Sequence, residues 1–337
     1  MKVGLTYDLR DDYLAQGFTI EQAAEFDSRE TIESLEAALA ENGYKVERIG
    51  NIKSLVRMLS DGRRWDIVFN ICEGVSGIAR EAQVPALLEA YDIPCVFSGA
   101  DVMVTTMDKS LAKIIVRENG LPTAPYKVIR SSDDFKGLDL TYPLFAKPLA
   151  EGTGKGIDAR SEISSAEELQ NKCFKLLDDF NQPVLVEEFL PGRDLTVGII
   201  GNGPDCRVIG VLEALYKNNA EGQSQSFFNK ENCETVLEYV LVKDAVATKA
   251  GEIALACWQA LGCLDGGRVD LRCDRNGTPC FLEVNPLSGL HPTHSDLPIL
   301  AAQAGITYRQ LIGEIMNAAL SRLFKVRQNN ENYRAAV

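Results

Sequence analysis

Apolar runs with the spacing of strands alternate with amphipathic stretches over the first part of the chain. The run 2–7 predicts a buried strand, and 28–44 predicts a helix because its apolar residues recur at helical spacing. Ser28 can cap this helix, and Gly43 can end it. The same pattern predicts further strands at 45–49, 65–71 and 93–99 and further helices at 52–60 and 80–92. Strands that alternate with helices form parallel sheets, so we expect residues 1–104 to be one α/β domain.

Two further units follow. In residues 105–189 the pattern predicts helices at 108–119 and 165–180 and strands at 126–130, 143–149 and 183–190. In residues 190–327 it predicts strands at 193–201 and 206–215, a helix at 244–262, a hairpin at 266–289 and a helix at 307–324. Residues 328–337 are polar, and we expect them to be a frayed tail.

The hairpin carries an unusual arrangement of charges. An Asn-Gly pair at 276–277 predicts a two-residue turn in which Arg275 faces Thr278. Counting back along both strands places two facing pairs on one side of the hairpin, Asp270 with Glu283 and Arg268 with Asn285. The opposite side then carries the apolar residues Val269, Leu271, Leu282 and Val284.

Asp270 and Glu283 would repel each other at this spacing, because facing Cβ atoms lie roughly 4.5–5.5 Å apart. Carboxylate and amide oxygens beside an arginine suit Mg²⁺ bound together with phosphates. A solvated face on which the two charges merely tolerate each other is the alternative. The pattern favours a metal site made by Asp270, Glu283 and Asn285.

The stretch 146–158 holds Gly152, Gly154 and Gly156 at alternate positions, with Lys147 and Lys155 beside them. Glycines spaced in this way let a backbone approach a phosphate. Neither the Walker nor the Rossmann spacing is present, so the pattern alone leaves the type of phosphate loop open.

Composition narrows the class of protein. A net charge of -13 without a long basic run argues against nucleic acid or an anionic membrane as the partner. The nine cysteines form no C-x-x-C pair, which favours reduced thiols in the cytoplasm over a disulfide framework. We see no signal peptide and no apolar run of transmembrane length.

Several segments in order resemble the ATP-grasp carboxylate–amine ligases, and D-alanine–D-alanine ligases in particular. They are "IPCVFSGADVMVTTMDKSLAK" at 93–113, "PLFAKPLAEGTGKGI" at 143–157, "VLVEEFLPGRDLTVGIIG" at 184–201, and "GRVD" with "FLEVNPLSGL" in the hairpin. The resemblance implies an ATP-grasp fold of mixed α/β (α+β) class. In it the N-terminal parallel-sheet domain is joined by two α+β subdomains that grip ATP.

The resemblance also implies roles. Lys109 and Lys147 would contact ATP phosphates, Glu187 and the backbone of 188–190 would read the adenine edge, and Asp194, where the family usually has Glu, would hold the ribose. The implied ATP-binding set is Lys109, Lys147, Glu151, Gly152, Thr153, Gly154, Gly156, Glu187, Glu188, Phe189, Leu190, Asp194 and Leu282. Arg268 would neutralise charge on the reacting group. Gly289 and Ser295 would hold the acceptor carboxylate, and Lys230 would belong to a gating loop.

The chain departs from the family pattern around the first substrate. The usual glycine-rich turn after the first strand is absent, and Glu25 or Glu30 would have to replace its glutamate. "CEGVSGIAREAQ" replaces a second family motif, which makes Glu73, Arg80 and Glu81 candidates for a different substrate site or for a simple charge cluster at a helix start. Thr153 and Gly154 stand where serines are usual, and Glu231 follows Lys230 in place of an aromatic residue or histidine.

We therefore expect an ATP- and Mg²⁺-dependent ligase, with Mn²⁺ as a possible substitute. It would activate a small carboxylate, such as an amino acid, as an acyl phosphate and form an amide. Its partners would be small molecules, with a homodimer possible. The alternatives are a true D-alanine–D-alanine ligase, and an ATP-binding regulator or phosphoryl-transfer protein that makes no amide. His291 and His294 are spaced like a metal pair on a helix, but the intervening proline argues against that geometry.

Overall fold

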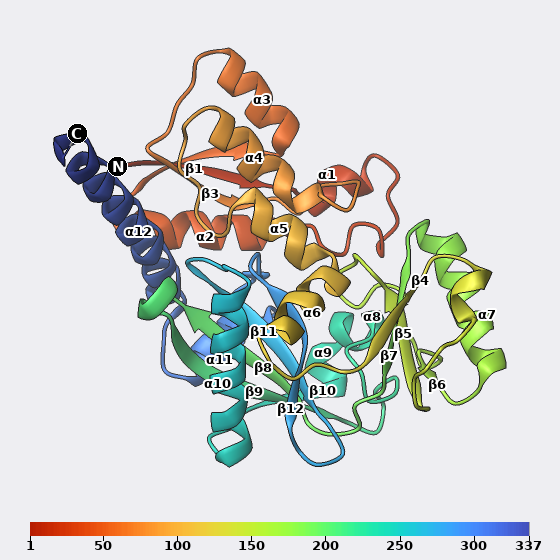
Figure 1. Cartoon of the computed structure of the whole chain (residues 1–337). Coiled ribbons are helices and arrows are strands. Elements are labelled where there is room, and N and C mark those ends of the chain that lie inside the picture. Colours follow the sequence, from red (N-terminus) through yellow and green to blue (C-terminus); the bar gives the residue numbers. More distant parts are fainter. Residues whose placement is uncertain (337) are drawn as a thin grey trace.

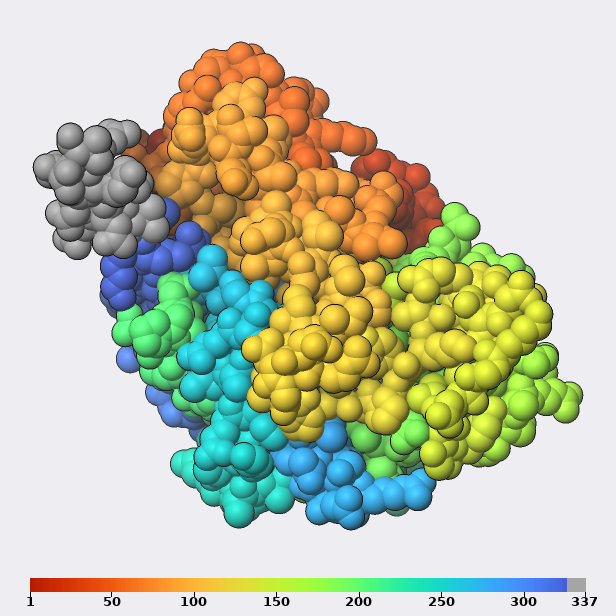
Figure 2. Space-filling view, in the orientation of Figure 1, coloured from red at the N-terminus to blue at the C-terminus, as the bar shows by residue number. Residues whose placement is uncertain are grey.

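The computed structural model describes residues 1–336, with side chains to residue 325. Three sheets follow one another along the chain, and helices cover their faces (Figure 1). In Figure 2 the parts that contain these sheets form neighbouring blocks of colour, orange at the top, yellow at the right and cyan to blue at the bottom. Within the described residues, no helix is both long and apolar enough to cross a membrane.

The first sheet is parallel, as predicted, with the order β2-β1-β3. Its strands are β1 (Lys2–Tyr7), β2 (Lys45–Gly50) and β3 (Ile67–Ile71), and its helical segments are α1 (Arg10–Leu14), α2 (Arg29–Glu41), α3 (Ile52–Ser60), η1 (Arg80–Ala82), α4 (Gln83–Ala90) and α5 (Ala100–Met107). Ser28 caps α2 by accepting a hydrogen bond from the Thr31 amide, and Gly43 follows the helix with a positive φ, both as predicted.

The predicted strand at 93–99 is wrong. This segment makes only an isolated bridge, in which Cys95 pairs with Val68 of β3. Pro94 has no amide hydrogen to donate, and Phe97 has a φ of 73°, which ends the extended backbone. The Phe97 amide instead donates to the buried Asp265 carboxylate of the C-terminal part.

The second sheet is antiparallel, with the order β4-β7-β5-β6. It consists of β4 (Tyr126–Ile129), β5 (Leu144–Pro148), β6 (Glu162–Ile163) and β7 (Val184–Glu188), with α6 (Lys109–Glu118), η2 (Ser132–Phe135) and α7 (Ala166–Phe180) alongside. Ser165 caps α7, whose apolar side packs on β5 around the buried Leu169, Cys173 and Leu176.

The third sheet has the order β10-β9-β8-β11-β12. Its strands are β8 (Asp194–Ile200), β9 (Arg207–Tyr216), β10 (Leu237–Leu241), β11 (Gly266–Cys273) and β12 (Pro279–Asn285). Its helices are η3 (Gly203–Asp205), α8 (Phe227–Glu231), α9 (Cys233–Val236), α10 (Ala245–Ala260), α11 (Asp296–Gln303) and α12 (Tyr308–Ala336). The helix α10 covers one face of this sheet around the buried Trp258.

The C-terminal helix α12 packs against the N-terminal part of the chain. Its buried Leu311, Ile312 and Ile315 share one core with Ile32 and Leu35 of α2, and the two helices lie side by side (Figure 1). The helix is longer than predicted, because its backbone continues through the expected tail to Ala336, while residue 337 lies outside the described residues. The domain boundaries at 104, 189 and 327 stay predictions.

The hairpin β11–β12 confirms the predicted pairs at the charged end. Asp270 is opposite Glu283, and Arg268 is opposite Asn285. The predicted turn is wrong, because the Asp274 amide, not Arg275, pairs with Thr278 across a longer turn. A bulge between Asp270 and Leu271 compensates for this difference. It lies beside Leu282, which the alternation placed on the core face and the family resemblance placed at ATP; Leu282 lines a cavity.

Candidate functional site

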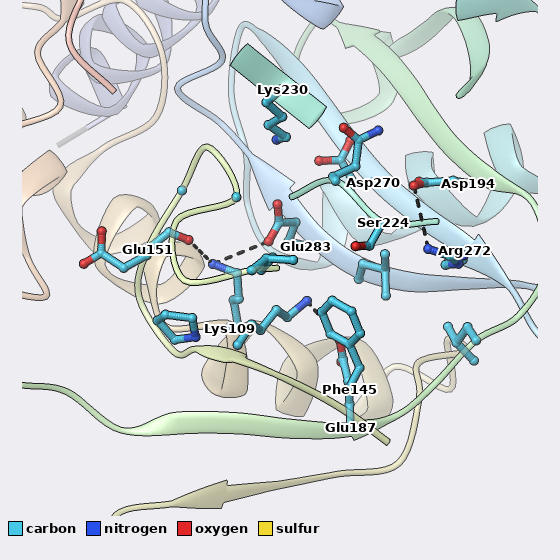
Figure 3. A pocket seen from close by; sticks show the side chains of 18 of the residues that line it. Lys109, Phe145, Glu151, Glu187, Asp194, Ser224, Lys230, Asp270, Arg272 and Glu283 are labelled. Atoms are coloured by element: carbon cyan, nitrogen blue, oxygen red, sulfur yellow. Dashed lines mark hydrogen bonds and ion pairs between the residues drawn. The ribbon is translucent and has the colours of Figure 1, made fainter. Parts of the chain in front are cut away.

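A cavity of about 870 Å³ lies between the second and third sheets (Figure 3). It brings together most of the predicted ATP-binding and metal residues and two of the predicted catalytic residues, Lys230 and Arg268. The predicted ATP-binding and metal residues are Lys109, Lys147, Glu151, Gly152, Gly154, Glu187, Glu188, Phe189, Leu190, Asp194, Asp270, Leu282 and Glu283. We call it the first cavity. Thr153, Asn285, Gly289 and Ser295 line an adjoining second cavity, together with Glu73 and Glu81, and Gly156 lies on the outer side of the loop.

Lys147 is held at the end of β5 by a buried carboxylate. Its Nζ lies 2.9 Å from Glu187 Oε1 on the neighbouring strand β7. The other oxygen, Oε2, lies 2.8 Å from the ammonium of Lys113, which is fully buried on α6. Burial alone would raise the pKa of Glu187, but the two lysines lower it to about 2. Glu187 therefore anchors Lys147, and its Oε2 makes no hydrogen bond to the described residues, so its role at the adenine edge stays a prediction.

The backbone that follows Glu187 faces the first cavity. The Glu188 side chain turns away and accepts a hydrogen bond from the Thr141 amide. The Phe189 amide donates to the Pro143 carbonyl, and the Phe189 ring stacks on Phe145 with ring centres 6.2 Å apart. Aromatic and aliphatic side chains with a main-chain edge form an apolar slot at this end of the cavity.

Asp270 and Glu283 lie at the other end, where lysines converge. Asp270 accepts hydrogen bonds from Thr196 at 2.9 Å and from Asn285 at 3.0 Å. The Lys109 ammonium lies 3.4 Å from Glu283 and donates to the Glu151 carbonyl at 2.6 Å (Figure 3). Thr196 was not predicted as a site residue. It lies two residues after Asp194 on β8, opposite Asp270, and this spacing places it on the same face of the strand as the predicted Asp194.

The two acids differ in pKa. Burial raises the pKa of Asp270 to about 6, with Glu283 adding to the rise and Arg268 opposing it. Burial would also raise the pKa of Glu283, but Lys109 and Lys147 lower it to about 2. A divalent cation beside these carboxylates would remove the penalty on ionised Asp270.

The donors at this end suit a hard cation. In the described part of the chain, no group of three or more His, Cys, Asp or Glu side chains is arranged to hold a metal ion. Asp270, Glu283 and Asn285 offer two carboxylates and one amide, which are the oxygen donors that Mg²⁺ uses when phosphates complete its coordination. The residues present therefore fit Mg²⁺ bound with a phosphate ligand, and would fit a closed protein cage poorly.

The glycine-rich loop is closed over the first cavity by an acid from the N-terminal part. Glu25 accepts a hydrogen bond from the Gly152 amide at 2.7 Å, and its carboxylate lies 3.1 Å from both Lys155 and Arg80. Arg80 also donates to the Ala150 carbonyl at 2.9 Å. Burial alone would raise the pKa of Glu25, but Arg80 and Lys155 lower it. We call Glu25, Arg80 and Lys155 the loop latch.

The loop touches a second segment at Gly154. This residue has a φ of 68°, and a Cβ added to it would lie 2.4 Å from the Gln225 carbonyl oxygen. Residues 225–227 therefore sit directly against the loop and lead into α8, which carries Lys230. Thr153 precedes Gly154 with a φ of 51° and faces the second cavity.

The second cavity, of about 1620 Å³, meets the first at Arg268. Arg268 lies 2.5 Å from Asp296 at the start of α11 and 3.3 Å from Asp270. Ser295 accepts a hydrogen bond from the His291 amide, and a side chain at Gly289 would collide with the Ser295 hydroxyl. Asp296 was not predicted, although it follows the predicted Ser295 directly.

The N-terminal wall of the second cavity is acidic. Glu73, Glu81 and Asp27 line it, and the described residues place no basic side chain within 4.0 Å of their carboxylates. Burial raises the pKa of Asp27 and of Glu81 to about 8 and that of Glu73 well above its usual range. Glu30 lies 3.6 Å from His291, so it is at the rim of this wall.

The two histidines do not lie on a helix. They lie on a turn, with ring centres 6.0 Å apart, and His294 contacts the Cys233 thiol at 3.6 Å. Proline between them prevents the helix on which their spacing would have aligned both rings, as the sequence indicated.

Two buried cations were missed by sequence reasoning. Lys113 lies four residues after Lys109 on α6, so their shared helix face was a usable signal. Arg272 lies two residues after Asp270 on β11, so it was predictable on the same face of the strand as Arg268 and Asp270.

The chain is similar to known proteins over most of its length. Residues 115–317 match the family described as "D-ala D-ala ligase C-terminus". A D-alanine–D-alanine ligase of Gluconobacter oxydans is 30% identical over 85% of this chain and 91% of its own. An uncharacterized protein of Sinorhizobium fredii, y4sG, is 31% identical over 87% and 88%. The structure of a Bacillus anthracis D-alanine–D-alanine ligase with ATP superposes with a TM-score of 0.74 at 22% identity, covering 98% of this chain and 99% of that one.

Proposed function

This chain belongs to the D-alanine–D-alanine ligase family, and on that premise we propose that it joins a small carboxylic acid to an amine at the cost of ATP. The ATP-grasp fold expected from the sequence is confirmed by the structural likeness. We propose that ATP lies in the first cavity and the two substrates in the second, so that the reaction takes place where the cavities meet.

The observation that carries this proposal is the position of Arg268. It lines both cavities and lies 3.3 Å from Asp270, so a group bound in either cavity can reach the same cation. Lys230 and Gly152 also line both cavities. A reaction that passes a phosphoryl group from one ligand to another needs such a shared boundary.

The chemistry follows from these residues. A carboxylate is a poor electrophile, and receiving a phosphoryl group turns it into an acyl phosphate with a good leaving group. Lys109, Lys147 and Arg268 would stabilise the negative charge that develops during this transfer. Mg²⁺ held by Asp270, Glu283 and Asn285 would supply further neutralisation of the phosphate charge. The amine then attacks the acyl carbon and displaces phosphate.

The closed loop would protect the acyl phosphate. Gly152 and Gly154 lie over the boundary of the cavities, and the loop latch ties them to the N-terminal part. Excluding water matters because water would hydrolyse the intermediate without forming an amide. Gly289 and Ser295, at the far side of Arg268, would position the acceptor.

The substrate wall differs from the one that the sequence suggested. Glu25 and Arg80 are paired with each other and with the loop, so we no longer propose them as direct substrate contacts. Glu73 and Glu81 face the second cavity and have no basic partner within 4.0 Å among the described residues. We propose that these two acids hold the ammonium group of the first substrate, whose positive charge would lower their raised pKa values and favour the ionised form.

The alternative with the same type of reaction is a D-alanine–D-alanine ligase, in which both substrates would be D-alanine. A regulator that binds ATP without making an amide is less favoured, because a pure nucleotide site would need neither the second cavity nor Arg268 at its boundary. From the resemblance we also propose a homodimer in the cytoplasm, and light scattering of the purified protein would measure its mass in solution.

The test is phosphate release with ATP and Mg²⁺ over pairs of D- and L-amino acids, hydroxy acids and dipeptides, with mass spectrometry of the products. We expect one pair to release phosphate and yield an amide. Release by D-alanine alone would support the alternative. Phosphate without any amide, across the whole panel, would contradict the ligase.

A further inference from the structure

Arg272 is a buried cation whose side chain has no hydrogen-bond partner among the residues that the structure describes. Its side chain is 7% exposed, its Nε is buried without an acceptor, and we find no hydrogen bond from this side chain to any of the described residues. The nearest carboxylate oxygen, Asp194 Oδ2, is 3.9 Å from NH1, which is beyond hydrogen-bonding distance. Burying an unpaired guanidinium is costly, so a ligand that supplies an acceptor would explain its position.

The position of Arg272 in the first cavity indicates which part of a bound ligand it would contact. It lines the first cavity from β11, four residues after Arg268, and so lies toward the apolar slot and away from the phosphate end. Its guanidinium lies 5.0 Å from the centre of the Phe189 ring. That ring can offset part of the charge, but it offers no hydrogen-bond acceptor in the ring plane.

Asp194 completes the arrangement on the neighbouring strand. It is directly opposite Arg272 in the register of β8 and β11 (Figure 3). Its Oδ2 accepts a hydrogen bond from the Tyr216 hydroxyl at 2.5 Å. Burial raises the pKa of Asp194, and Arg272 and Tyr216 oppose that rise. The carboxylate thus depends on Arg272 for its charge without bonding to it.

A donor and an acceptor separated by 3.9 Å match a hydroxyl group between them. A hydroxyl oxygen can accept from the guanidinium and donate to the carboxylate, with each bond about 2.7–2.9 Å long. A methylene group in the same place could do neither, so Arg272 would stay without an acceptor and Asp194 would keep only its bond from Tyr216.

We propose that Arg272 and Asp194 form a donor–acceptor clamp on a ribose hydroxyl, and that Arg272 makes the site selective for ribonucleotides over deoxyribonucleotides. This inference rests on the proposed binding of ATP in the first cavity. It adds to the expected role of Asp194 the partner that polarises the hydroxyl, and it assigns a function to an arginine that the reaction does not use.

The test is direct binding of ATP, 2′-deoxy-ATP and 3′-deoxy-ATP by isothermal titration calorimetry, without amino-acid substrates. Loss of a hydrogen bond to a charged group should weaken binding of at least one deoxy form about 10- to 100-fold in the unmodified protein. Arg272→Met should lose most of that preference, so that ribo and deoxy forms bind within about twofold of each other. Arg272→Lys should keep part of it.

Three results would overturn the clamp. In the first, the unmodified protein binds all three nucleotides with equal affinity. In the second, the Arg272→Met protein keeps the full preference for ATP, and in the third, the substitution lowers the affinity for all three nucleotides equally, as expected if Arg272 only stacked on the base. If the unmodified protein bound none of the three nucleotides, the proposed function would be overturned as well. The proposed function and the clamp therefore fail by different results. The melting temperature of the ligand-free Arg272→Met protein serves to show that it is folded, and the preference among the three nucleotides, which a purely structural arginine would not change, decides the result.

Discussion

Asp270 and Glu283 face each other across β11 and β12, but their carboxyl groups have different pKa values. Glu283 is kept ionised by Lys109 and Lys147, which lower its pKa to about 2. Asp270 depends on hydrogen bonds from Thr196 and Asn285, and burial holds its pKa at about 6. Glu283 is therefore the permanent anion of the pair.

We predict that Glu283→Gln lowers the affinity for a divalent cation more than any other single change in the hairpin. The substitution removes the ionised carboxylate and leaves Lys109 to repel the cation. Manganese binding followed by electron paramagnetic resonance in the presence of ATP should weaken at least about 10-fold. The control is Glu252→Gln on α10, whose side chain is 62% exposed and should change nothing. Unchanged binding in Glu283→Gln would rule out this carboxylate as a ligand.

A second prediction concerns stability and pH. The folded pKa of Glu187 is about 2 against an ordinary value of 4.5, so its ionised form stabilises the fold above about pH 4.5. That contribution is lost as the pH falls from 4.5 toward 2. Glu187→Gln removes the nearest counter-charge of the buried ammonium groups of Lys113 and Lys147 and should cost about 3–5 kcal/mol at pH 7.

Urea unfolding of both proteins between pH 3 and pH 7 measures this difference. We expect it to shrink below about pH 4, because Glu187 of the unfolded chain then binds a proton that the folded protein does not, which favours unfolding. A difference that is the same at pH 3 and pH 7 would show that the loss arises from packing. Glu162→Gln, at an exposed position on β6, is the control.

A third prediction concerns the loop latch. Glu25→Gln keeps the shape of the side chain but removes the charge that faces Arg80 and Lys155. The loop should open more often, so water should reach the acyl phosphate, and the ratio of phosphate released to amide formed should rise about fivefold or more. Glu21→Gln, an exposed residue of the same segment, should leave the ratio near one. An unchanged ratio in Glu25→Gln would mean that the latch does not control water access.

A fourth prediction separates backbone strain from contact. Gly154→Ala and Gly222→Ala both place a side chain at a φ near 65°, but only the first would collide with another segment, at the Gln225 carbonyl. We expect Gly154→Ala to reduce kcat about 10-fold or more, and Gly222→Ala to have little effect. Equal losses in the two proteins would indicate that strain, not the contact between the loop and 225–227, limits the reaction.

Sequence reasoning worked where a pattern repeats over short range. The period of two in β11 and β12 was enough to place Arg268, Asp270, Glu283 and Asn285 on one face. The alternation of strands and helices predicted the parallel sheet. In both cases the information lies within one hairpin or one strand–helix unit.

Sequence reasoning failed where a residue is paired with another residue far along the chain. Lys113 can be buried only because Glu187 lies beside it, on a strand that follows more than sixty residues later. Glu25 was a candidate for the substrate, but its pairing with Arg80 and with Gly152 depends on how three parts of the chain meet. The bulge beside Leu282 has no signal of its own, since one extra residue leaves the apolar pattern readable in either register.

That bulge also makes the tip of the hairpin a useful place for protein engineering. The pairing on its two sides differs by one residue, so the bulge separates the charged pair Asp270 and Glu283 from the turn at 274–278. The tip is exposed at residues 275–278, and Gly277 has open space around it. A short peptide tag or fluorophore site could therefore be inserted there, and it would report on the movement of this sheet while leaving the charged end of the hairpin in place.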